Sequence, residues 1–310
     1  MTRVRVRYAR LVKMITNTRT VVALLAVAVC GLAACGTSAA APADGRIAVV
    51  TSTDVWGSVV SAVGGADVQV TAIIHDPSQD PHDYQSTPSD AARISTAKLA
   101  VYNGNGYDDF FARDLNASSS DGRATIVAFA LSGQPASANE HIFYDLPTVV
   151  KVADAVAARL GRIQPAHAST FTANAAAFDR GVNGLLATVR QIGVRHPGRQ
   201  VVVTEPVADY LLHAAGVTDG TPPAFEHAVE SDTDIPVAAI NATTQLITAH
   251  RVAAVINNAQ TVTNVTTQLV GTAHANGIPV VNVTETLPAG ATGYLAWMTS
   301  QVDALAAALT

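Results

Sequence analysis

The chain has 310 residues, of which 49% are hydrophobic and 14% are charged. This composition can bury the core of one large domain or of two smaller ones, and it excludes an intrinsically disordered protein. The formal net charge is −5, and it becomes −11 once the first 34 residues are set aside, because 13 basic residues then remain against 24 acidic ones. Such an acidic chain is a poor partner for nucleic acid or anionic lipid.

The N-terminal segment 1–34 has the three parts of an export signal. A basic region is followed by the apolar run Val21–Leu32, which is too short to span a bilayer, and then by small residues before Cys35. The run Leu-Ala-Ala-Cys resembles a bacterial lipobox, which implies that Cys35 becomes the lipidated first residue; the alternative is an ordinary secretory signal cleaved nearby. Translation could start at Met1 or at Met14.

Cysteine chemistry is excluded after processing. Cys30 leaves with the signal and Cys35 carries the lipid, so no free thiol remains for a disulfide, a metal or catalysis.

Beyond a flexible tether over residues 35–45, short apolar runs alternate with helical patterns. Thr87 and Pro88 are typical of a helix N-cap and of the first helical position. The pattern predicts strands at 47–50, 68–74, 98–102 and 125–130, and helices at 55–63 and 87–97.

The alternation breaks in the middle of the chain, where helices are expected at 147–160 and 164–192 with no strand between them. It then resumes, with predicted strands at 201–204, 252–256 and 280–284, helices at 207–215, 235–250, 262–276 and 294–309, and an acidic loop at 221–234. Strands separated by helices form parallel sheets covered on both faces. We therefore predict an α/β protein with two Rossmann-like lobes, 46–163 and 194–310, joined by a long rigid helix at 164–193.

Ligand-type side chains follow several predicted strands. His82 and His141 lie after strands of the first lobe, and Glu205 and Glu285 follow strands of the second, in the matching contexts VVVTEP and VNVTET. Ligands of open parallel sheets bind beyond the carboxyl ends of the strands, and two-lobed proteins favour the cleft between the lobes. Imidazole and carboxylate ligands suit a divalent metal such as Zn²⁺ or Mn²⁺. His75 is an alternative ligand.

These residues resemble the metal-binding lipoproteins of bacterial zinc and manganese ABC importers. The family motif D-P-H-x-Y-x-x-x-P-S-D matches Asp80–Asp90, and its N-G-x-G turn matches Asn103–Gly106. By position, the resemblance implies that His141, Glu205 and Glu285 are the other three ligands. The run around His141 departs from the family pattern, Glu285 stands where Asp is usual, and the His-rich loop of zinc members is absent.

The resemblance implies a monomeric, non-enzymatic carrier on the outer face of the bacterial cytoplasmic membrane. It would capture Zn²⁺ or Mn²⁺, with the balance slightly toward zinc, and deliver the ion to an ABC transporter permease. The alternative is a metal-dependent hydrolase with the same ligands, although the sequence offers no recognisable general base and no H-E-x-x-H motif. Binding should weaken as the pH falls through the histidine range.

Overall fold

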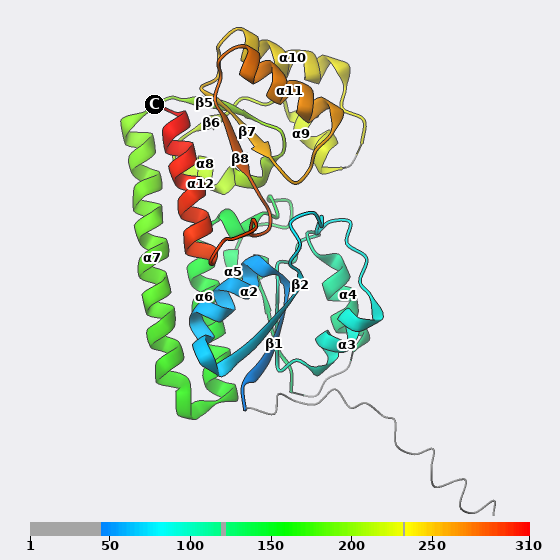
Figure 1. The fold of residues 1–310 in the computed structure, drawn as a ribbon, viewed down its shortest axis with the longest axis vertical. Coiled ribbons are helices and arrows are strands. Elements are labelled where there is room, and N and C mark those ends of the chain that lie inside the picture. Colours follow the sequence, from blue (N-terminus) through cyan, green and yellow to red (C-terminus); the bar gives the residue numbers. More distant parts are fainter. Residues whose placement is uncertain (1–44, 119–121, 232) are drawn as a thin grey trace, which may run out of the picture. The chain divides into compact units, whose positions relative to one another are not determined.

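Two blocks of alternating strands and helices form two α/β lobes (Figure 1). The computed structural model describes residues 45–118, 122–231 and 233–310, so the predicted signal peptide, Cys35 and nearly all of the tether lie outside the described residues. Within these ranges each lobe contains one four-stranded sheet, in the order β2-β1-β3-β4 or β6-β5-β7-β8. All strand pairs are parallel, which confirms the predicted fold class.

In the first lobe, the central strand β1 (Ile47–Thr53) is buried almost throughout because helices cover both faces of its sheet. Val49 packs into the cluster that contains residues of α2 (Asp54–Gly64), and the next residue, Val50, packs on the other face against Ile94. Successive strand residues point to opposite faces, which explains this division. The lobe also contains β2 (Val68–Ile74), β3 (Leu99–Tyr102), β4 (Ala124–Val127), α3 (Pro88–Thr96), α4 (Asp109–Ala117) and α5 (Ala128–Ser132).

The second lobe repeats this plan around β5 (Gln200–Val203). Val201 and Val203 face one core cluster, and Val202 faces the other with Phe225 and Leu269. The remaining elements are β6 (Thr218–Asp219), β7 (Ala254–Asn258), β8 (Val280–Val283), α8 (Asp209–Ala214), α9 (Pro223–Glu230), α10 (Val237–Thr248) and α11 (Asn264–Ala275).

A layer of long helices runs beside both lobes (Figure 1). The helix α7 (Ala168–Arg195) has 28 residues, a length of about 42 Å. It packs against α6 (Leu146–Ile163) and against the last helix, α12 (Tyr294–Ala308), which also contacts α2 of the first lobe. All described residues belong to one compact unit. The division into lobes at 46–163 and 194–310, with a linking helix at 164–193, stays a prediction.

The structure corrects four local predictions. Residues 128–130, expected in a strand, begin α5, and the expected loop 221–234 contains α9, whose Phe225 and Ala228 are buried. The helix α4 and the two-residue strand β6 were not expected. The N-cap prediction is confirmed, since Thr87 forms a capping box with Asp90 and Pro88 is the first helical residue. Every helix in the described ranges is too short or too polar to cross a membrane.

Candidate metal centre

The four predicted ligands lie together where the two sheets' strand ends meet. His82 lies in the loop between β2 and α3, and His141 precedes the 3₁₀ turn Ile142–Tyr144 that leads into α6. Glu205 and Glu285 each stand two residues beyond the end of their strands, β5 and β8. Ligand atoms of His82, His141 and Glu205 lie within 4.8 Å of one another.

Glu285, which follows the last strand of the second lobe, completes this group. Its Oε2 atom is 3.7 Å from the Nε2 atoms of both His82 and His141. Among the described residues, Oε2 of Glu285 and Nε2 of His141 are buried and have no hydrogen-bond partner. Unpaired buried polar atoms are costly, so two of them facing one point fit a cation that would satisfy both.

Burial differs among the four side chains. The side chain of His141 is 0% exposed and that of Glu285 is 2% exposed, whereas that of His82 is 30% exposed. Glu205 is also buried. His82 is therefore the candidate ligand nearest solvent.

A hydrogen bond orients the ring of His141, and a backbone hydrogen bond and an aromatic contact position His82. Asn139 donates from Nδ2 to the Pro206 carbonyl, so its Oδ1 accepts from His141 Nδ1 at 2.8 Å. Because Nδ1 of the neutral ring carries the proton, the lone pair is on Nε2, which faces the other candidate ligands. In the loop of His82, Oδ1 of Asp80 accepts the backbone N–H of His82 at 2.9 Å, and the rings of His82 and Tyr107 pack edge to face.

One asparagine joins the two carboxylates. Asn258, the last residue of β7, donates from Nδ2 to Oε2 of Glu205 at 2.6 Å and to Oε1 of Glu285 at 2.8 Å. Asn258 is 0% exposed. No single-residue pattern in the sequence identifies this role; the position of Asn258 at a strand end of the second sheet was the available signal.

The electrostatics of the cluster are those of a buried imidazole among carboxylates. Burial alone would lower the pKa of His141, but its interaction with the Glu285 carboxylate outweighs burial and raises the pKa to about 9. Burial raises the pKa of Glu285, and the two imidazoles reverse this, so its pKa lies below the usual value. Burial and the nearby charge of Glu285 raise the pKa of Glu205. His141 is therefore protonated near neutral pH without metal, and an ion that bound its Nε2 atom would have to displace that proton.

The segment that carries Glu285 is bound closely to the first lobe. The Tyr144 hydroxyl donates to the Thr284 carbonyl at 2.9 Å, and the Asp54 carboxylate accepts the N–H of Leu287 at 3.1 Å. Gln260 adds a third contact between this segment and the first lobe. Its Oε1 atom accepts the N–H of Glu285, and its Nε2 atom donates to the Pro77 carbonyl. Glu285 thus belongs to the second lobe by sequence and to both lobes by contact.

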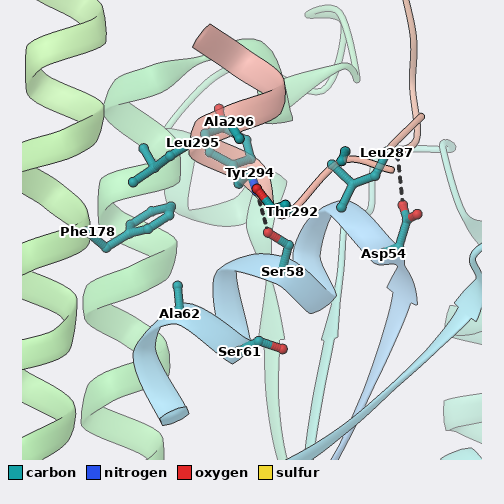
Figure 2. A pocket seen from close by; sticks show the side chains of 12 residues that line it. Asp54, Ser58, Ser61, Ala62, Phe178, Leu287, Thr292, Tyr294, Leu295 and Ala296 are labelled. Atoms are coloured by element: carbon teal, nitrogen blue, oxygen red, sulfur yellow. Dashed lines mark hydrogen bonds between the residues drawn. The ribbon is translucent and has the colours of Figure 1, made fainter. Parts of the chain in front are cut away.

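A cavity of about 660 Å³ lies beside this segment, between α2, α7 and the start of α12. Figure 2 shows Asp54 bonded to Leu287 and Ser58 bonded to the N–H of Tyr294 at its edge. Among the described residues that line it there is no histidine, and the one carboxylate, that of Asp54, is hydrogen-bonded to the segment. The cavity is therefore separate from the four-residue cluster.

A second group of ligand-type atoms shares His141. Atoms of Glu140, His141 and Glu230 lie within 4.8 Å of one another, and Glu230, at the end of α9, is exposed. Sequence reasoning missed Glu230 because α9 was expected to be a loop, and it did not single out Glu140 as a ligand beside its neighbour His141. His75 joins neither group of described residues; its Nδ1 atom lies 3.1 Å from the Ile73 carbonyl.

Comparison with known proteins identifies the chain's relatives. The family model described as zinc-uptake complex component A, periplasmic, matches residues 49–308. The chain belongs to this family. The family resemblance that the sequence showed is therefore confirmed.

Individual proteins that resemble the chain share about a quarter of its residues or fewer. The manganese-binding lipoprotein MntA of Bacillus subtilis is 26% identical over 152 residues, 46% of this chain and 49% of the relative, so the match spans about half of that protein. MntA of Halalkalibacterium halodurans is 26% identical over 243 residues, which cover 72% of this chain and 79% of the relative. The zinc-binding protein TroA of Treponema pallidum has a TM-score of 0.72 at 20% identity, covering 86% of this chain and 100% of TroA, which shows that the fold is shared.

Proposed function

We propose that this protein captures a divalent transition-metal ion outside the cytoplasm and delivers it to an ABC transporter permease. The observation that carries the proposal is the meeting of two imidazoles and two carboxylates in one buried cluster. Within it, Nε2 of His141 and Oε2 of Glu285 face each other at 3.7 Å without hydrogen-bond partners among the described residues. The metal would be the cargo of the protein and not a resident cofactor.

We assign the four ligand roles to His82, His141, Glu205 and Glu285. Neutral imidazole and ionised carboxylate are the donors that Zn²⁺ and Mn²⁺ accept in proteins, and the two carboxylates would offset the charge of the ion in a buried site. His82, with its side chain 30% exposed, would be the ligand that an arriving ion meets first. His141 and Glu285 would complete the shell as the hydration of the ion is lost.

The proposed cargo is Zn²⁺ or Mn²⁺, with a preference for Zn²⁺. The relatives' names support both metals, since the two MntA proteins are named for manganese and TroA for zinc. Two imidazoles and the general order of affinities of nitrogen and oxygen sites for divalent ions favour Zn²⁺ over Mn²⁺.

Metal transport explains the family membership better than a metal-dependent hydrolase activity does. The family is described as a component of a zinc-uptake complex, and neither the family nor its relatives give support to a hydrolase. The lipidation of Cys35, the anchoring of the chain to the outer face of the cytoplasmic membrane and a monomeric state are parts of the same proposal. Lipidation and anchoring rest on the sequence of the N-terminal segment, and the monomeric state rests on the family resemblance.

The test is a metal titration of the chain from Gly36 to Thr310, stripped of metal. Calorimetry with Zn²⁺ and with Mn²⁺ should show one tight site per chain. His82→Ala and Glu205→Ala should each weaken binding at least tenfold, the usual scale for a lost ligand or its partner. His274→Ala, an exposed histidine on α11, is the matched control and should bind like the unaltered protein. Absence of binding by the unaltered chain would refute capture, and binding that survives both ligand substitutions would refute the site.

A further inference from the structure

The amide of Asn258 has only one orientation that satisfies its neighbours. The backbone N–H of Gln260 can only donate, and it lies 3.0 Å from Oδ1 of Asn258, so Oδ1 is the acceptor end of the amide. Nδ2 is therefore the donor end, and it faces Oε2 of Glu205, Oε1 of Glu285 and the hydroxyl of Thr261. Since Asn258 is 0% exposed, water does not compete for these bonds.

This single amide engages one oxygen of each carboxylate. In Glu285 the other oxygen, Oε2, lies 3.7 Å from both histidine Nε2 atoms and has no hydrogen-bond partner among the described residues. A carboxylate that binds a metal through both oxygens must turn both toward the ion. The hydrogen bonds from Asn258 oppose that rotation in Glu205 and in Glu285 at once, because both acceptors share one donor group on a buried strand end.

We infer that Asn258 is a specificity-determining residue that keeps Glu205 and Glu285 monodentate. This inference rests on the proposed capture function and names its preferred cargo. Two imidazole nitrogens and two single carboxylate oxygens make a four-coordinate shell, which is the tetrahedral arrangement that Zn²⁺ adopts in proteins. Mn²⁺ favours octahedral sites rich in oxygen, and without added water these four side chains could supply six donor atoms only with both carboxylates bidentate. Asn258 thus favours zinc without contacting the ion.

The first test uses the unaltered protein from Gly36 onward, which contains the whole compact unit. Co²⁺ bound in place of the cargo should give the intense visible absorption of a four-coordinate ion. A weak spectrum typical of six-coordinate cobalt would overturn the inference. This measurement does not depend on the folding of any variant.

The second test compares Asn258→Ala with Asn257→Ala. Asn257 is the preceding residue of the same strand, and its Nδ2 donates to Oδ1 of Asn282, away from the carboxylate pair. Calorimetry should show that Asn258→Ala shifts the ratio of zinc affinity to manganese affinity toward manganese by roughly tenfold, the scale of a lost partner of a metal ligand. Asn257→Ala should leave the ratio unchanged.

The outcomes separate the two proposals. If the unaltered protein binds Zn²⁺ or Mn²⁺ and both variants keep its affinity ratio, the inference about Asn258 is wrong and the capture function stands. An equal shift in both variants also overturns the inference, because it would reflect a general weakening of β7. If the unaltered protein binds neither metal, the capture function fails, and the inference fails with it.

Discussion

Removing the Tyr144 hydroxyl tests how firmly the segment carrying Glu285 is fixed to the first lobe. Tyr144 is 0% exposed. Its hydroxyl donates to the Thr284 carbonyl at 2.9 Å and accepts the Thr284 N–H at 3.4 Å, one residue before the candidate ligand. Tyr144→Phe deletes both hydrogen bonds and keeps the ring, so core packing is conserved.

The expected cost follows from these two bonds. Each contributes about 1 kcal/mol net, and the amide and carbonyl left behind add to the loss where water cannot replace the hydroxyl. Since Thr284 is only partly buried, we expect the free energy of unfolding to fall by about 2 kcal/mol. A loss of that size lowers the melting temperature by about 4–8 °C in a protein of this length.

The assay is thermal unfolding of the metal-free protein, followed by zinc titration of the same samples. Tyr102→Phe is the matched control, because Tyr102 is half-buried and its hydroxyl forms no hydrogen bond with the described residues. We expect Tyr144→Phe to bind zinc several-fold more weakly, since Glu285 would be held less firmly. If Tyr144→Phe and Tyr102→Phe have the same melting temperature, the tyrosine contact does not fix the segment and the reasoning is refuted.

Three further predictions concern the histidines and the first lobe. His141→Ala should lower the free energy of unfolding of the metal-free protein by about 3 kcal/mol, because it leaves the buried Glu285 carboxylate without its imidazole. His82→Ala should lower it by under about 1 kcal/mol, because His82 is partly exposed. Urea denaturation of the two variants measures both losses. With a folded pKa of about 9 against an ordinary value near 6.5, His141 stabilises the metal-free protein most below pH 6.5 and loses that contribution as the pH rises to 9. Zinc binding at pH 7.5 should therefore release about one proton from His141, as calorimetry in buffers of different ionisation enthalpy would show. Arg123 donates to three backbone carbonyls, so Arg123→Ala should lower stability by about 2 kcal/mol and leave zinc affinity unchanged.

Each of these predictions can fail clearly. Equal losses of stability for both histidine substitutions would mean that burial does not distinguish them. Zinc binding without proton release would mean that His141 is already neutral in the metal-free protein. A loss of zinc affinity in Arg123→Ala would mean that the first lobe's outer helices influence the metal centre.

The alternation of strands and helices was readable from the sequence because it depends on local patterns. Runs such as Val201–Val203 are buried on both faces of a parallel sheet and remain apolar throughout. The helix α9 was missed because its eight residues include acidic side chains, and only the spacing of Phe225 and Ala228 indicated a buried face. The edge strand β6 has two residues, too few for any periodic signal.

The candidate ligands were predictable, but the residues that orient them were not. His82, His141, Glu205 and Glu285 follow strand ends, where topology collects ligand-binding groups. Asn258 also follows this rule, yet asparagine at the end of a strand is common and carries no charge that would mark it. Glu230 reaches the cluster only through the folding of α9. Such contacts depend on tertiary packing, which no local pattern encodes.

The attachment of the Glu285 segment to the first lobe has a consequence for how an ion would leave. Tyr144 and Asp54 bind this segment on either side of Glu285, so a movement between the lobes that preserves these bonds would carry Glu285 along with both histidines. Glu205 would then be the only candidate ligand to move away. Asn258, on the neighbouring strand, would move with it and lose its hydrogen bond to Glu285. Three candidate ligands would then stay with the first lobe and one would leave with the second. The rate of ion release would be set by the withdrawal of the Glu205 carboxylate.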